Sequence, residues 1–68
     1  MKKNILTPRE EEVFELLVLN KTTKEIATFL CISEKTVRNH ISNTIQKLGV
    51  KGRTQAVIEL IKLGILNF

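Results

Sequence analysis

Residues 22–48, TTKEIATFLCISEKTVRNHISNTIQKL, carry two consecutive helix signals with a short turn between them. Thr22 and Glu25 form a capping box, in which each side chain can bond the backbone N–H of the other residue. Apolar residues at helical spacing follow this box. A serine then offers a second N-cap, and the helix after it has an apolar face that consists of Val37, Ile41, Ile45 and Leu48. The spacing predicts helices over about 23–31 and 34–48.

The turn between these helices has the composition of a helix-turn-helix. Two helices that meet at a steep angle need a small residue at their contact, and Ala27 provides it. Leu30 and Ile32 flank the turn as apolar anchors. Cys31 takes a turn position that many such motifs give to Gly. We expect Cys31 to be a partly buried small apolar residue, with a redox switch as the alternative.

The outer face of the helix over 34–48 is polar. At about 100° per residue, the side chains that point away from its apolar face are Lys35, Asn39, Ser42 and Gln46, with Arg38 and Asn43 on the flanks. Glu34, at the start of the helix, is the acidic residue of this segment. Arg can pair with two acceptors of guanine, and Asn can pair with adenine. The face therefore favours the reading of DNA base edges over plain solvation.

Residues at the two helix starts suit DNA phosphates, because backbone N–H groups at a helix N-terminus favour an anion. They are Thr22, Thr23 and Lys24 at the first helix and Lys35 and Thr36 at the second. Further basic residues lie beyond the second helix start, and these are Lys47, Lys51 and Arg53. Plain solvation is an equal alternative for the last two. His40, at the margin of the apolar face, is expected to be a packed, hydrogen-bonded residue, with a phosphate contact as the alternative.

Two more helices flank this segment. Thr7, Pro8 and Glu10 predict a helix that begins at Pro8, ends near Leu19 and leaves Asn20 in the left-handed conformation. Its predicted inward stripe is Val13, Leu16 and Leu17, with Phe14 on the flank. Gly49 and Gly64 end the helices over 34–48 and about 53–63. Since strand alternation is missing, we expect an all-α fold of four helices in one compact domain over residues 1–68.

The helix over 53–63 is more apolar than a core-facing stripe requires. Ala56, Val57, Leu60 and Ile61 can face the core, whereas Ile58, Lys62 and Ile65 lie largely on another side. An exposed patch of this kind suits a two-fold partner. We therefore predict a homodimer whose interface contains Ile58, Ile61, Lys62 and Ile65. The alternative is that Ile58 and Ile65 are isolated apolar residues on the surface.

Composition excludes several classes of protein. The net charge of +4, from 11 Lys and Arg against 7 Asp and Glu, suits a polyanion but also many other proteins. One Cys and one His fall short of a structural zinc site. No nucleophile stands beside a base, so we expect neither an enzyme nor a cofactor. The opening apolar run stops at Thr7, and no stretch approaches the ~20 residues of a membrane span. We expect a cytoplasmic protein without membrane contact.

Four separated motifs of the chain resemble the DNA-binding domain of the LuxR/FixJ family of bacterial regulators. They are LTPREEEV at 6–13, KEIA at 24–27, SEKTVRNHISN at 33–43 and KLGVKGRTQAV at 47–57. The resemblance implies a four-helix domain of the winged-helix type without the wing, and helix 34–48 in the major groove of double-stranded DNA. It also implies transcription control, including small regulators of spore formers, and pairing through helix 53–63, with RNA polymerase as a further partner.

The family's residue roles are carried over only where this chain matches its motifs. Base reading falls on Arg38, Asn39 and Ser42, and backbone contacts fall on Lys24, Lys35 and Thr36. Many relatives have Gly at the position of Asn20 and an apolar residue at that of Lys21, a difference confined to the corner between the first two helices.

Two questions stay open at the level of sequence. Only six residues precede Thr7, so a receiver or ligand-sensor domain does not fit there. Either the whole protein acts through its abundance, or the chain is an excised effector domain. The rival function is a small helical adaptor, whose helix 53–63 binds another protein while its basic face is incidental.

Overall fold

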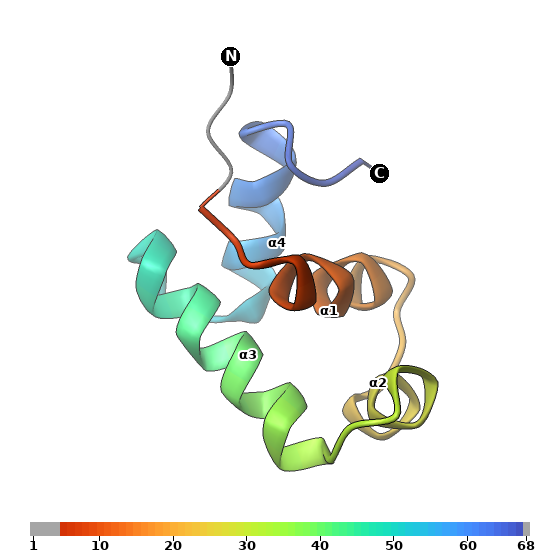
Figure 1. The fold of residues 1–68 in the computed structure, drawn as a ribbon. Coiled ribbons are helices and arrows are strands. Elements are labelled where there is room, and N and C mark those ends of the chain that lie inside the picture. Colours follow the sequence, from red (N-terminus) through yellow and green to blue (C-terminus); the bar gives the residue numbers. More distant parts are fainter. Residues whose placement is uncertain (1–4, 68) are drawn as a thin grey trace.

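Four helices make up residues 5–67 of the chain, the part that the computed structural model describes, and no strand occurs in that range (Figure 1). They are α1 (Pro8–Val18), α2 (Thr23–Leu30), α3 (Glu34–Leu48) and α4 (Arg53–Lys62). The predicted all-α class is confirmed. The domain predicted over 1–68 also includes residues 1–4 and 68, which lie outside the described range.

The first three helices begin where a side chain caps them. The Thr7 hydroxyl accepts a hydrogen bond from the Glu10 backbone N–H at 3.1 Å, and the Glu10 carboxylate accepts one from the Thr7 N–H at 3.0 Å. Thr22 and Glu25 make the same reciprocal pair at the start of α2. At α3, the Ser33 hydroxyl accepts from the Thr36 N–H at 3.0 Å. These caps satisfy backbone donors that the first turn of a helix leaves unpaired.

Left-handed residues end the helices and turn the chain. Asn20 has φ 66°, Gly49 φ 67° and Gly64 φ 77°, as their positions predicted. Cys31 also has φ 60°, although it carries a Cβ. The prediction that Cys31 is partly buried was wrong: its side chain is exposed, because the neighbouring Leu30 and Ile32 take the inward positions of the turn.

Each helix contributes a pair of residues to one hydrophobic core. The buried pairs are Val13 and Phe14, Ile26 and Ala27, Val37 and Ile41, and Ala56 and Leu60, joined by Leu6 and Leu66 from the two ends. Phe14 is fully buried, and Leu16 and Leu17 are only partly buried, which differs from the predicted stripe. The reason is that α1 contacts all three other helices and therefore buries a wide arc of its surface.

α3 lies along one side of the domain, in contact with each of the other helices (Figure 1). α1, α2 and α4 are all on the same side of it, so its opposite face is uncovered. α1 lies between α2 and α4, which do not contact each other. The fold therefore presents one long helix face to the surroundings.

Candidate nucleic-acid interface

The uncovered side of α3 is polar along its whole length. We call it the α3 outer face; it consists of Lys35, Arg38, Asn39, Ser42, Asn43 and Gln46, and all of these residues are exposed. The opposite side of the same helix buries Val37, Ile41 and Thr44. The structure thus brings the three residues predicted to read bases, Arg38, Asn39 and Ser42, onto one surface.

Arg38 is paired within its own helix. Its Nη1 lies 3.6 Å from Oε1 of Glu34, and both side chains are about half exposed, at 57% and 46%. A pair this exposed contributes at most about 1 kcal/mol, so the guanidinium can turn to another acceptor at little cost. This pairing of Glu34 was not predicted from the sequence. The spacing of four residues between Glu34 and Arg38 could have indicated this ion pair, because it places the two side chains one turn apart.

The start of α2 combines a cation with a carboxylate. Thr22 and Lys24 are exposed and Thr23 is half-buried. The capping box already uses the N–H groups of Thr22 and Glu25, so an anion here would be met by the N–H groups of Thr23 and Lys24. The bond from the Thr22 N–H lowers the pKa of Glu25 below its ordinary value. The negative charge of Glu25 opposes a phosphate, and Lys24 offsets it.

The start of α3 presents a hydroxyl that is already oriented. The Ser33 hydroxyl donates to Oγ1 of Thr36 at 2.9 Å, and it accepts from the Thr36 backbone N–H. Because the Thr36 oxygen is the acceptor in the first bond, its own proton stays available for another acceptor. The exposed ammonium of Lys35 lies next to it in the chain. Together the two residues can bind a phosphate oxygen with one neutral and one charged donor.

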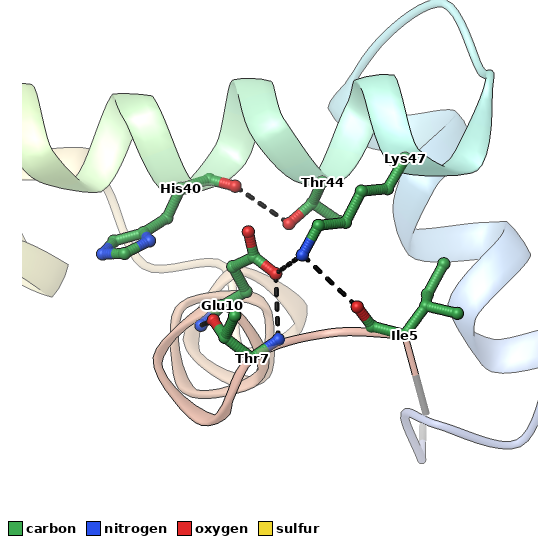
Figure 2. A network of polar contacts seen from close by, with 6 residues as sticks. All are labelled: Ile5, Thr7, Glu10, His40, Thr44 and Lys47. Atoms are coloured by element: carbon green, nitrogen blue, oxygen red, sulfur yellow. Dashed lines mark hydrogen bonds and ion pairs between the residues drawn. The ribbon is translucent and has the colours of Figure 1, made fainter. Parts of the chain in front are cut away.

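Lys47 differs from the other residues predicted to contact the DNA backbone, because its ammonium is turned toward α1 (Figure 2). Its Nζ donates to Oε1 of Glu10 at 2.6 Å and to the carbonyl oxygen of Ile5 at 3.3 Å. These two bonds occupy two of the three donor protons of the ammonium.

The carboxylate that binds Lys47 is buried. Glu10 is only 3% exposed. Burial raises the pKa of Glu10, but the hydrogen bond and charge of Lys47 and the N–H of Thr7 outweigh it and hold the pKa below its ordinary value. The sequence indicated the capping role of Glu10 and missed the ion pair, because 37 positions separate the partners and no periodic pattern connects them.

Lys51, Arg53 and His40 are the other basic residues for which the sequence left two roles open. Lys51 and Arg53 are exposed in the loop after α3 and at the start of α4. His40 is half-buried, and its carbonyl oxygen accepts from the Thr44 hydroxyl at 2.8 Å (Figure 2). The exposure of Lys51 and Arg53 suits either a phosphate contact or plain solvation. The half-buried position of His40 suits either a packed residue or a phosphate contact.

An apolar groove lies between α4 and the end of α1. It has a volume of about 390 Å³, and its lining consists of Leu17, Val18, Thr54, Val57, Ile58 and Ile61. The groove thus includes two of the four residues predicted for a dimer interface, of which Ile58 is 48% exposed. Lys62 is exposed and Ile65 packs partly against the core, and neither lines the groove. The contribution of α1 was missed, because Leu17 was assigned to the core and Val18 was given no role.

Residues 5–67 contain neither a candidate metal site nor a helix that could span a membrane. Within that range no group of three or more His, Cys, Asp or Glu side chains is placed to hold a metal ion. None of the four helices is long and apolar enough to cross a membrane.

Comparison with known proteins places the chain among bacterial regulators. A family model described as bacterial regulatory proteins, luxR family, matches residues 4–60. The spore germination protein GerE of Bacillus subtilis (strain 168) is 73% identical over 65 residues, which are 96% of this chain and 88% of GerE. The transcriptional regulatory protein DegU of Brevibacillus brevis is 52% identical over 61 residues, 90% of this chain but 26% of DegU.

The fold agrees with these similarities. A solved structure of the transcription factor GerE superposes with a TM-score of 0.93 and 63% identity, and the match covers 96% of this chain and 97% of that one. The resemblance inferred from the four motifs is therefore confirmed. Because the matched family consists of regulatory proteins, the expectation that the chain is not an enzyme is confirmed as well.

Proposed function

Because this chain belongs to the luxR family of bacterial regulatory proteins and is a DNA-binding transcriptional regulator, we propose that it binds DNA as a homodimer with α3 of each copy in a major groove. The observation that carries this proposal is the α3 outer face, a continuous exposed surface of amide, hydroxyl and basic groups. A major groove admits one α-helix, and such groups match its pattern of donors and acceptors. The helices α1, α2 and α4 pack against the opposite side of α3.

Base reading is assigned to Arg38, Asn39 and Ser42. The Arg38 guanidinium can leave Glu34 and bind O6 and N7 of a guanine, whereas Asn39 can bind N6 and N7 of an adenine. Ser42, one turn from Arg38, can donate or accept and so adapts to either neighbour. Each bidentate contact contributes about 1–3 kcal/mol of discrimination.

Backbone contacts are assigned to Thr22, Thr23, Lys24, Lys35 and Thr36. They lie at the first turns of α2 and α3, where helix dipoles and backbone N–H groups favour phosphate. Contacts at two helix starts fix the position of α3 along the groove without reading sequence. Lys47, also predicted to contact the backbone, retains one donor proton beyond its bonds to Glu10 and Ile5. We assign to it mainly the positioning of α3.

The dimer is assigned to the groove between α1 and α4, with Ile58 and Ile61 at its centre. Two copies related by a two-fold axis would bury the same apolar residues against one another. Lys62 lies at the edge of this contact. Ile65 supports α4 from the core side, since it packs against the core. The two α3 helices would then meet half-sites about 34 Å apart, one turn of DNA.

The biological setting follows from the similarity to GerE, whose name places it in spore germination. We propose that this chain controls transcription in the cytoplasm of a spore-forming bacterium and that it contacts RNA polymerase as an activator.

Selection of binding sites from random double-stranded DNA with the full chain tests this function. We expect a two-fold symmetric site whose half-sites are about one helical turn apart. Affinity for that site is expected to fall steeply as salt rises, because each phosphate contact releases counterions. Failure to enrich any sequence, or an affinity that salt does not change, would favour the adaptor over the DNA reader.

A further inference from the structure

A second apolar groove lies at the corner between α1 and α2, away from the α3 outer face. It has a volume of about 590 Å³, and Leu16, Leu19, Thr28 and Phe29 form much of its lining. The side chains of Phe29 and Leu19 are 73% and 66% exposed, more than any other large hydrophobic residue among the described ones. An apolar concavity of this size on a small domain marks a site of interaction.

This corner groove is separate from the α1–α4 groove assigned to the dimer. At about 100° per residue, Leu16 and Leu19 lie on one side of the last turn of α1, and Leu17 and Val18 lie on the opposite side. α1 stands between α2 and α4, which do not contact each other (Figure 1). A partner on α4 therefore leaves the corner groove open.

The corner groove is also separate from the surface that packs α2 against α3. α2 buries Ile26 and Ala27, whereas it lines the groove with Lys24, Glu25, Thr28 and Phe29 from its other side. DNA in contact with the α3 outer face and the first turn of α2 would therefore border this groove and leave Phe29 uncovered. Lys24 lies at the boundary between the two surfaces.

The rim of the corner groove is basic. Lys21 and Lys24 supply two positive charges, against one negative charge from Glu25. The Glu25 carboxylate is held by the Thr22 N–H at 2.8 Å, within its own helix cap. Among the described residues, no salt bridge occupies Lys21 or Lys24. The complementary partner is a segment with an apolar ridge and flanking Asp or Glu side chains.

We propose that the corner groove binds an acidic amphipathic helix of RNA polymerase, which seats apolar side chains against Leu19 and Phe29 and pairs a carboxylate with Lys21, while Lys24 stays on the DNA phosphate. The proposal rests on the proposed function and deepens it, because it names the surface that meets the polymerase. The position of Lys24 places the occupant directly beside the bound DNA, where a polymerase on a neighbouring promoter lies. Helix-in-groove recognition of this kind uses apolar anchors one turn apart.

The test measures DNA binding and polymerase binding separately. A DNA fragment carries the selected site upstream of a weak promoter, and the probe is RNA polymerase holoenzyme purified from Bacillus subtilis. The test variants are Lys21→Glu and the double variant Leu19→Ser with Phe29→Ser; the matched control is Ile5→Ser, an apolar residue 44% exposed that lines neither groove. Footprints on the DNA alone are expected to change by no more than about twofold for the double variant and Ile5→Ser, whose residues lie outside the DNA contacts. Lys21→Glu is compared with the wild type at protein concentrations that saturate the site for both, because a carboxylate at position 21 repels the phosphate at the start of α2.

With polymerase present, the wild-type protein and Ile5→Ser are expected to increase retention of the holoenzyme on the fragment. For Lys21→Glu and the double variant, this increase in retention is expected to be about tenfold smaller, because each removes an interface anchor. Equal retention by all variants would overturn the proposal. A wild-type protein that fails to bind the selected DNA would instead overturn the proposed function.

A photo-crosslinking residue in place of Phe29, in the full chain on DNA, identifies the occupant. A crosslink to a polymerase segment rich in Asp, Glu and apolar residues supports the proposal. A crosslink to a second copy of this chain, to DNA, or to a polymerase segment without acidic residues overturns it.

Discussion

The Lys47 ammonium lies 2.6 Å from Oε1 of Glu10, and this bond ties the last turn of α3 to the first turn of α1 (Figure 2). The same carboxylate oxygen accepts the Thr7 N–H at 3.0 Å, so one buried atom both caps α1 and holds the end of α3. The Ile5 carbonyl accepts a second Lys47 proton at 3.3 Å. Because Glu10 is almost fully buried, its charge without Lys47 is costly, whereas the Lys47 side chain, 35% exposed, can turn to solvent.

Glu10→Gln is expected to destabilise the fold by about 1–3 kcal/mol, because an amide keeps the size of the side chain but removes the charge that Lys47 faces. Urea unfolding, followed by circular dichroism, measures the effect. The matched control is Glu12→Gln, which alters an exposed pair with Arg9 on the same helix and should change stability by less than about 0.5 kcal/mol. Equal effects of the two changes would contradict the assigned role of Glu10.

The stability of the domain is expected to fall in acid, and Glu10 is a main reason. Its pKa is lower in the folded state than its ordinary value, so its contribution is fully present above the ordinary value and is lost as pH falls through the folded value. The difference in unfolding free energy between the wild type and Glu10→Gln should therefore shrink from about pH 5 downward. Urea titrations at a series of pH values measure it. A difference that stays constant down to the acid limit would show that the charge of Glu10 is irrelevant.

Local signals account for the parts of the fold that the sequence predicted well. The capping pairs at Thr7 and Thr22 and the left-handed Asn20 and Gly49 act over three or four residues, so each can be read from a short window. Helix periodicity likewise separates the buried and exposed sides of α3, because that helix packs on one side only.

The features that the sequence did not predict depend on how the helices pack against one another. Phe14 is central because α1 is contacted from three directions, which no single periodicity expresses. The corner and α1–α4 grooves each combine side chains from two helices, so neither is visible in one helical pattern. The Glu10–Lys47 pair likewise joins α1 to α3, through residues 37 positions apart in the chain. Such contacts depend on the angles between helices, which composition and spacing leave open.

Arg38→Ala is expected to relax the sequence preference at one position of each half-site, with a loss of about 1–3 kcal/mol for the preferred base and little for the other three. The physical reason is the loss of a bidentate contact to guanine. Binding to a set of single-base variants of the selected site measures this pattern. The control is Arg9→Ala, an arginine of similar exposure on α1. A uniform loss across all variants would show that Arg38 is a phosphate contact.

Lys24→Ala is expected to weaken binding to every DNA sequence alike. A phosphate contact carries no base information, and its removal should reduce the slope of log affinity against log salt by about 1 for each copy. Affinity for the selected site and for unrelated DNA is measured between low and moderate salt. Lys21→Ala removes a neighbouring charge that is not assigned to DNA and serves as the control. If Lys24→Ala changed only the preferred site, Lys24 would have to contact a base.

Ile58→Glu is expected to separate the dimer while leaving each copy folded. Its side chain is 48% exposed and lines the α1–α4 groove, so a carboxylate is tolerated in the free chain but would be buried unpaired in a two-fold contact. Sedimentation should show a shift to monomer, and affinity for the two-fold site should fall toward that for a single half-site.

The control is Ile5→Glu, which places the same charge on an exposed position outside this groove. Ile65 is less suitable for this test, because it packs partly against the core and a charge there would also unfold the domain. An unchanged affinity and footprint for Ile58→Glu would exclude the α1–α4 groove as the dimer contact.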